Sequence, residues 1–184
     1  MNSGVIASRY AKALLKYVEE TGAGDKVYSQ ACVLGLRFVE IRQLRDFVEN
    51  HAELPVEKKI DLLKAALGED PAPEMVTFVN LITQRRRMNL FSRMLVSFIM
   101  QYRAANQIKV GRIMLAAPVD GLKERLEALF HERTRADVQL YESINPEILG
   151  GFVFEMDGYR LDASVENQFR RIRRQLIEKN NRLI

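Results

Sequence analysis

The sequence predicts an α+β protein, with an N-terminal six-helix bundle followed by a small C-terminal α/β domain that holds a β-hairpin and a terminal helix. Two observations lead to this prediction. Over about the first hundred residues, apolar side chains recur at helical spacing between short loops. From residue 108 apolar residues alternate instead, and Asp157-Gly158 between two such runs is typical of a hairpin turn. We place the boundary near residues 104–107, which gives domains 1–105 and 106–184.

Each helix of the predicted bundle is defined by apolar residues at helical spacing. The first covers residues 5–20 and ends at a loop rich in glycine. The others are expected at 26–40, at 42–50, from Pro55 to a stop at Gly68, at 74–86 and at 90–106. The helix over 74–86 is apolar nearly all round, which exceeds what a single core face requires.

The first helix carries two apolar stripes. The stripe expected to face the core consists of Ala7, Ala11, Leu14 and Val18. The stripe beside it consists of Tyr10, Ala13 and Tyr17. Two interpretations remain open. The helix is buried on two sides within its own domain, or the second stripe receives a partner helix in a shallow groove formed by a small alanine beside tyrosine rings.

The C-terminal domain is predicted to follow the order strand, helix, strand, hairpin and helix. The first three elements are expected at residues 108–117, 119–134 and 137–141. The terminal helix is expected over residues 164–180 and closes the fold through one apolar stripe. That stripe consists of Val165, Phe169, Ile172 and Leu176.

Four residues around the hairpin have predicted structural roles. Gly150 and Gly151 permit a positive φ or a close backbone approach where the next strand begins. Asp162 or Ser164 is suited to cap the terminal helix, because a short oxygen-bearing side chain there accepts a hydrogen bond from a free helical N–H. These residues form a structural motif rather than a reactive site.

No catalytic motif is present, and we expect neither enzymatic activity nor a cofactor or metal ion. His51 and His131 each stand alone without ligands at metal-binding spacing, so surface positions are expected. The single cysteine, Cys32, lies in an apolar run and is expected to be a small buried residue. The glycine-rich phosphate loop and the nucleophile elbow are both absent from the sequence.

Charge and hydropathy narrow the class of protein further. The 184 residues include 28 basic and 24 acidic ones, a net charge of +4. No apolar run approaches the roughly 20 residues of a membrane span, so direct membrane insertion is not expected. The first residues lack a secretory signal pattern. We therefore expect a cytosolic protein that reaches a membrane only through a partner.

Two arginine groups support an alternative, a helical nucleic-acid-binding protein. They are Arg85 to Arg87 at the end of the fifth predicted helix, and Arg170, Arg171, Arg173 and Arg174 on the last one. Cations at a helix C-terminus also stabilise the helix dipole, and arginines beside an apolar stripe are usually solvated. Because neither half of the chain is strongly basic, we favour an interaction module over a nucleic-acid binder.

Three stretches of the sequence resemble a known family. Leu149-Gly150-Gly151, the hairpin and Asp162-Ala163-Ser164-Val165 resemble the C-terminal signature of the δ subunit of F-type ATP synthases, whose mitochondrial relative is the oligomycin-sensitivity-conferring protein. The family usually has glycine where this chain has Ala163. Residues 8–14 are similar to the family's opening helix, and residues 90–98 to its junction between the fifth and sixth helices.

The resemblance implies a non-catalytic peripheral-stalk subunit that links the α/β catalytic head to the b subunits and supports the coupling of proton transport to ATP synthesis. It implies that the bundle binds the N-terminal helix of an α subunit through helices one and five, and that the C-terminal domain contacts the b subunits. The implied groove residues are Tyr10, Ala13, Tyr17, Phe78, Leu81 and Ile82. The implied location is the cytoplasmic face of the bacterial inner membrane.

Overall fold

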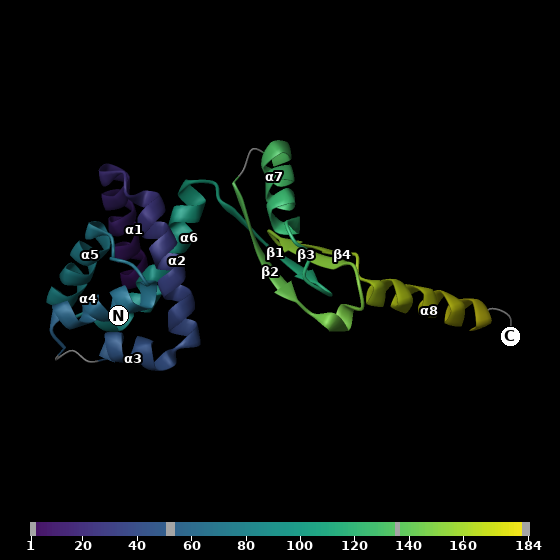
Figure 1. Cartoon of the computed structure of the whole chain (residues 1–184), viewed down its shortest axis with the longest axis horizontal. Helices are drawn as coiled ribbons and strands as arrows, with labels where there is room; N and C mark the ends of the chain where they lie inside the picture. The colour runs from purple at the N-terminus through teal and green to yellow at the C-terminus, as the bar shows by residue number, and fades with distance from the viewer. Residues whose placement is uncertain (1–2, 51–53, 135–136, 182–184) are drawn as a thin grey trace. The chain divides into compact units, whose positions relative to one another are not determined.

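The computed structural model describes residues 3–50, 54–134 and 137–181, and the chain divides into two compact units, Met1–Asn106 and Gln107–Ile184. Helices occupy the first unit, and a four-stranded sheet with two helices occupies the second (Figure 1). The predicted α+β class is therefore confirmed. The division falls one residue beyond the predicted boundary at residue 105.

The helices of the first unit lie close to their predicted positions. Their bounds are α1 Ser3–Thr21, α2 Gly24–Glu40, α3 Arg42–Asn50, α4 Val56–Leu67, α5 Pro73–Gln84 and α6 Phe91–Ala105, with a short 3₁₀ helix, η1, at Met88–Leu90. Gly68 adopts a left-handed φ of 75° and ends α4 as predicted. Helix α5 ends two residues earlier than predicted, because Arg86 takes a φ of 53° and turns the chain away.

The core of the first unit is built around α6, which packs against α1 and α2. Its side chain Phe91 is fully buried and meets Phe38 edge-on, with ring centroids 5.9 Å apart. The inner stripe of α1 is buried along its whole length, from Ala7 to Val18. Each large apolar side chain removed from water contributes on the order of 1.5–3 kcal/mol, so these buried side chains are the main stabilising contacts of the unit.

A buried glutamine connects α2 to the loop before α5. The Gln30 side-chain nitrogen donates to Glu69 Oε1 at 2.7 Å and to the Asp70 carbonyl at 3.1 Å. Its side-chain oxygen accepts from the Ala72 amide at 2.8 Å. Since Gln30 is only 2% exposed, these bonds are needed to offset its desolvation, and they fix where α5 begins.

The second unit is a mixed sheet with strand order β2-β1-β3-β4. Its elements are β1 Lys109–Leu115, α7 Leu122–Thr134, β2 Val138–Ile144, the 3₁₀ helix η2 Pro146–Ile148, β3 Phe152–Met156, β4 Tyr159–Asp162 and α8 Val165–Asn181. β1 is parallel to β2, joined by α7 as crossover, and antiparallel to β3. Phe130 of α7 stacks on Phe154 of β3 with centroids 5.1 Å apart, so α7 covers one sheet face.

The strand after α7 is longer than predicted because it pairs with β1 as far as Ile144. Beyond η2, Gly151 has a φ of +72°, and a Cβ on it would lie 2.3 Å from the Ala163 carbonyl oxygen. Gly150 lies close to Val165: a Cβ on Gly150 would be 3.0 Å from Cγ2 of Val165. The expected roles of these two glycines, positive φ and close approach, are both found.

Two predicted burials are wrong. The apolar stripe of α8 does not close the fold, since Phe169 is 61% exposed and Ile172 is 52% exposed. The helix packs against η2 near its start and then extends beyond the sheet (Figure 1), while the side chain of Leu176 lies outside the described residues. Cys32 is half-buried rather than buried, because its flank of α2 is only partly covered.

Candidate partner-binding surfaces

The second stripe of α1 faces outward. Ala13 is exposed, Tyr17 is 36% exposed and Tyr10 is half-buried. The interpretation in which α1 is buried on two sides within its own unit is therefore wrong. A small side chain between two aromatic rings leaves a shallow apolar surface on a unit whose core is already complete.

Of the three α5 residues predicted to line the same surface, one is exposed and two are buried. Leu81 is 41% exposed and available to a partner. Phe78 and Ile82 are 4% and 0% exposed, so in this structure they belong to the core and present no outer face. The physical reason is that α5 packs against α4, α1 and η1, and the Phe78 ring points inward to Phe91, with ring centroids 6.5 Å apart. The surplus of apolar residues on α5 is thus used mostly inside the unit.

Arg87 also borders this surface, although it is not among the groove residues predicted from the sequence. Arg87 Nη1 donates to the Tyr10 hydroxyl at 3.1 Å, and the guanidinium carbon lies 5.4 Å from the centroid of the Tyr10 ring. The turn after α5 positions it: the Arg87 amide donates to the Ile82 carbonyl and the Arg86 amide to the Thr83 carbonyl, each at 2.9 Å. We call Tyr10, Ala13, Tyr17, Leu81 and Arg87 the α1–α5 surface.

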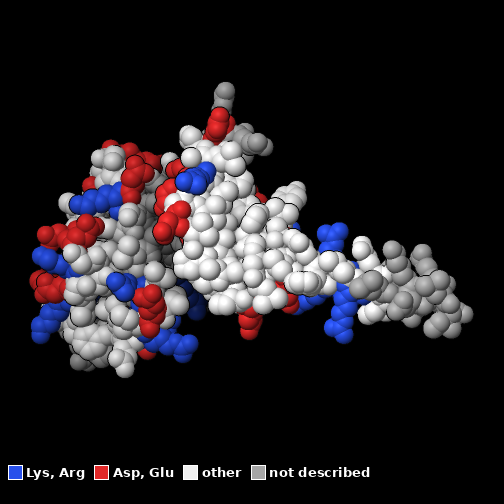
Figure 2. Space-filling view, turned by 45° about the vertical axis from the view of Figure 1, so that its right-hand side comes forward, with Lys and Arg blue, Asp and Glu red and all other residues white. Residues whose placement is uncertain are grey.

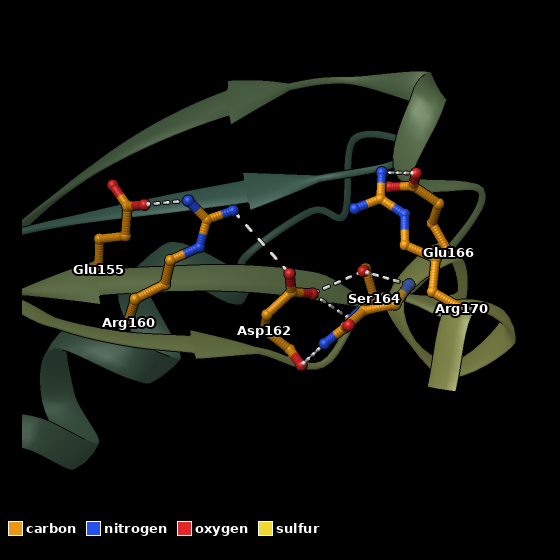
Figure 3. A network of polar contacts seen from close by, with 7 residues as sticks. Glu155, Arg160, Asp162, Ser164, Glu166 and Arg170 are labelled. Carbon is orange, nitrogen blue, oxygen red and sulfur yellow. Dashed lines mark hydrogen bonds and ion pairs between the residues drawn. The ribbon is translucent and has the colours of Figure 1, made fainter. Parts of the chain in front are cut away.

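The C-terminal motif is a helix cap (Figure 3). Ser164 is 1% exposed, and its hydroxyl accepts from the Asn167 amide at 3.1 Å, which caps α8. Asp162 holds that hydroxyl: its Oδ1 accepts from Ser164 Oγ at 2.6 Å and from the Ser164 amide at 3.1 Å. The bond from the Ser164 hydroxyl, with that from the amide, lowers the pKa of the Asp162 carboxyl. Of the two predicted caps, Ser164 is therefore the cap, and Asp162 holds it in place.

The cap fixes the start of α8, which forms a second outward-facing surface. Its exposed apolar residues are Phe169, Ile172 and Ile177. Arginines 170, 171, 173 and 174 are exposed beside them, and Arg170 pairs with Glu166 one turn earlier. Figure 2 shows these basic side chains projecting from the start of α8, whereas acidic and basic side chains are intermixed on the visible face of the first unit.

The described residues show neither a metal-binding cluster nor a membrane-spanning helix. Within the described ranges no group of histidine, cysteine or acidic side chains is arranged to hold a metal ion. His131 is exposed, as expected, and His51 lies outside the described residues. Of the helices that the structure describes, none has the length and apolar character needed to cross a membrane.

Comparison with known proteins decides the family. A family model described as ATP synthase delta (OSCP) subunit matches residues 6–176. The chain belongs to this family. ATP synthase subunit delta of Phocaeicola vulgatus is 41% identical to it over 186 residues, covering 100% of each chain. The corresponding subunit of Bacteroides thetaiotaomicron is 33% identical over 186 residues, again with full coverage of both.

A solved structure agrees in fold. A chain of the cryo-EM structure of the Toxoplasma gondii mitochondrial ATP synthase hexamer matches with a TM-score of 0.60 and 19% identity, covering 93% of this chain and 97% of that one. Membership of the delta family makes the protein a non-catalytic peripheral-stalk subunit of F-type ATP synthase. This supports the main prediction over the nucleic-acid-binding alternative, and the arginines that follow α5 lie in a different unit from those of α8.

Proposed function

We propose that this delta subunit holds the catalytic head by binding the N-terminal helix of an α subunit on the α1–α5 surface. One observation carries the proposal: α1 exposes Tyr17 and Ala13, while the stripe that it buries in its own unit is the neighbouring one, from Ala7 to Val18. An amphipathic helix that lays its apolar face on such a surface is a common mode of recognition. Leu81 widens the surface, and Arg87 gives it a polar border.

Phe78 and Ile82 take part only indirectly in this proposal. Their side chains are covered by the core, so they support α5 and do not touch the incoming helix. The contact residues are therefore those that are accessible, Tyr10, Ala13, Tyr17 and Leu81. Rigid docking of this kind requires no rearrangement of the first unit.

The second unit is proposed to contact the b subunits through α8. Exposed Phe169, Ile172 and Ile177 form an apolar stripe that no described element of the chain covers. An unpartnered apolar stripe flanked by arginines fits a long amphipathic helix with acidic side chains. With the head bound at one unit and the b subunits at the other, the protein connects the two and opposes rotation of the head. Its proposed location is the cytoplasmic face of the bacterial inner membrane.

Co-purification tests the proposal. The tagged full chain, mixed with detergent-solubilised membranes, is expected to recover α and b subunits equally with and without nuclease. A variant with Phe169→Glu and Ile172→Glu is expected to lose b while retaining α, because its substitutions are confined to α8. Loss of both subunits in that variant, or recovery that depends on nucleic acid, would contradict the assignment of one partner to each unit.

A further inference from the structure

A cavity of about 530 Å³ opens on the first unit, and none of its lining residues belongs to the α1–α5 surface. It is lined by Glu49, Asn50, Lys59, Thr83, Arg86, Met88 and Asn89. These residues come from the end of α3, the first turns of α4, the end of α5 and η1. Such a cavity is large enough to hold several water molecules or a small polar ligand.

Lys59 is unusual among the residues that line this cavity. It is 1% exposed, and every other lysine whose burial the structure describes is exposed or half-buried. The described part of the chain contains two further buried polar side chains, Gln30 and Ser164, and each is fully engaged in hydrogen bonds. Within the ranges that the structure describes, no hydrogen bond or ion pair joins the Lys59 amine to another residue, although the side chain as a whole is buried.

Burial without a partner has a measurable cost. Desolvation lowers the pKa of the Lys59 amine, because the charged form has lost water. A buried ammonium is stabilised when an anion supplies the missing charge and hydrogen-bond acceptors. The cavity gives such an anion access to Lys59, the side chain that most needs it.

The other polar groups of the cavity also favour an anion. Arg86 contributes a second cation, and its φ of 53° places it at the turn that closes α5. Of the described lining residues, Glu49 alone carries a carboxylate, and its Oε1 accepts from the Ser92 amide at 2.8 Å at the start of α6. Asn50 and Asn89 add neutral amide donors. Among the lining residues that the structure describes, two cations and one carboxylate leave a net positive charge.

We propose that this cavity, built by Lys59 and Arg86, is a binding site for a small oxyanion, a phosphate or a carboxylate. Lys59 supplies a desolvated point charge, Arg86 a planar guanidinium, and the asparagine amides complete the shell. The ligand reaches the site either as free phosphate or as the carboxylate of an acidic side chain. The site is independent of the α1–α5 surface and does not rest on the proposed function.

Anion titrations of the full chain test the site. Amide chemical shifts of isotope-labelled protein are followed with inorganic phosphate, with N-acetylglutamate amide, and with sodium chloride at matched ionic strength. Phosphate or the carboxylate is expected to shift Thr83, Arg86 and Asn89 with saturation, while chloride does not. Saturation with phosphate alone identifies a free phosphate site, and saturation with the carboxylate identifies a site for an acidic side chain. An absence of saturable shifts there with both anions overturns the proposal.

A pair of variants isolates the buried charge. Lys59→Met keeps the length of the side chain, and Lys58→Met removes the same charge from the exposed neighbouring residue. Lys59→Met is expected to weaken anion binding at least tenfold and to abolish anion-dependent thermal stabilisation, while Lys58→Met retains both. Equal binding by the two variants would show an unspecific effect of surface charge and would overturn the site. Should Lys59→Met fail to fold, the wild-type titration still decides.

Discussion

Substitution of Gly151 by alanine should unfold the second unit locally, and Gly158 provides the matched control. Both glycines have a left-handed φ, +72° at Gly151 and +81° at Gly158. A non-glycine residue in that region costs roughly 1–2 kcal/mol at either position. The two differ in space: nothing lies within 4 Å of a Cβ on Gly158, whereas a Cβ on Gly151 meets the Ala163 oxygen at 2.3 Å.

The backbone of Ala163 has to move to relieve that contact. Its amide donates to the Phe152 carbonyl at 3.0 Å, and the Val165 amide donates to the Gly150 carbonyl at 3.0 Å. Each of these hydrogen bonds contributes about 1 kcal/mol, so weakening both adds about 2 kcal/mol. We therefore expect a loss of about 3–4 kcal/mol for Gly151→Ala, against about 1–2 kcal/mol for Gly158→Ala.

Hydrogen exchange read by mass spectrometry measures the difference. Because two compact units need not unfold together, exchange is followed separately in peptides covering β3, β4 and the start of α8 and in peptides covering α1 and α6. Protection should fall in the first set, more for Gly151→Ala, and stay unchanged in the second. Equal losses for the two alanine variants would refute the argument that Gly151 is required by the approach of Ala163.

Three further predictions concern the linker, the helix cap and the buried lysine. Limited proteolysis should cut first near residues 104–107 and leave a helical fragment of about residues 1–105, because few contacts cross a domain linker; first cuts within α1 to α6 would contradict this. The Asp162 carboxylate should contribute stability above its unfolded pKa of 3.8 that is lost as pH falls through its lower folded pKa, and Ser164→Ala should largely remove that acid dependence in urea unfolding. Lys59→Met should raise the free energy of unfolding by about 1 kcal/mol at neutral pH without added anion. Because the folded pKa of Lys59 lies below 10.5, this gain should shrink as pH rises from the folded value through 10.5, and a pH-independent gain would argue against a buried charge.

Periodicity was sufficient to predict the helices and the inner stripe of α1, because Ala7, Ala11, Leu14 and Val18 repeat at the spacing that one helix face requires. It did not predict which neighbour covers a face. α5 and α8 both carry apolar residues at helical spacing, yet Phe78 of α5 is in the core while Phe169 of α8 is exposed. Whether an apolar helix face is buried depends on which other element packs against it. That element can be distant in sequence, so local periodicity does not identify it.

The same limit applies to the surfaces. Arg87 borders Tyr10 across 77 residues of sequence through the turn at Arg86, and no local pattern signals that contact. Lys59 lies in the first part of α4, and nothing in the sequence around it distinguishes it from an exposed lysine. Only the folded structure shows that it is buried. By contrast, the helix cap was predictable, since Asp162 and Ser164 act over two residues and use short side chains.

The proposed head-binding surface is tested most directly by calorimetric titration of the full chain with a peptide of the α-subunit N-terminus. Ala13→Glu places a carboxylate in the centre of the α1–α5 surface, where Ala13 is exposed in the free protein and would be desolvated on binding. Val39→Glu places the same group on α2 at a residue that is 75% exposed. We expect Ala13→Glu to lose about 3 kcal/mol or more of binding free energy, more than a hundredfold in affinity, with unchanged helicity. Val39→Glu should bind as the wild type does. Wild-type affinity in a folded Ala13→Glu variant would contradict the account and place the head-binding surface elsewhere.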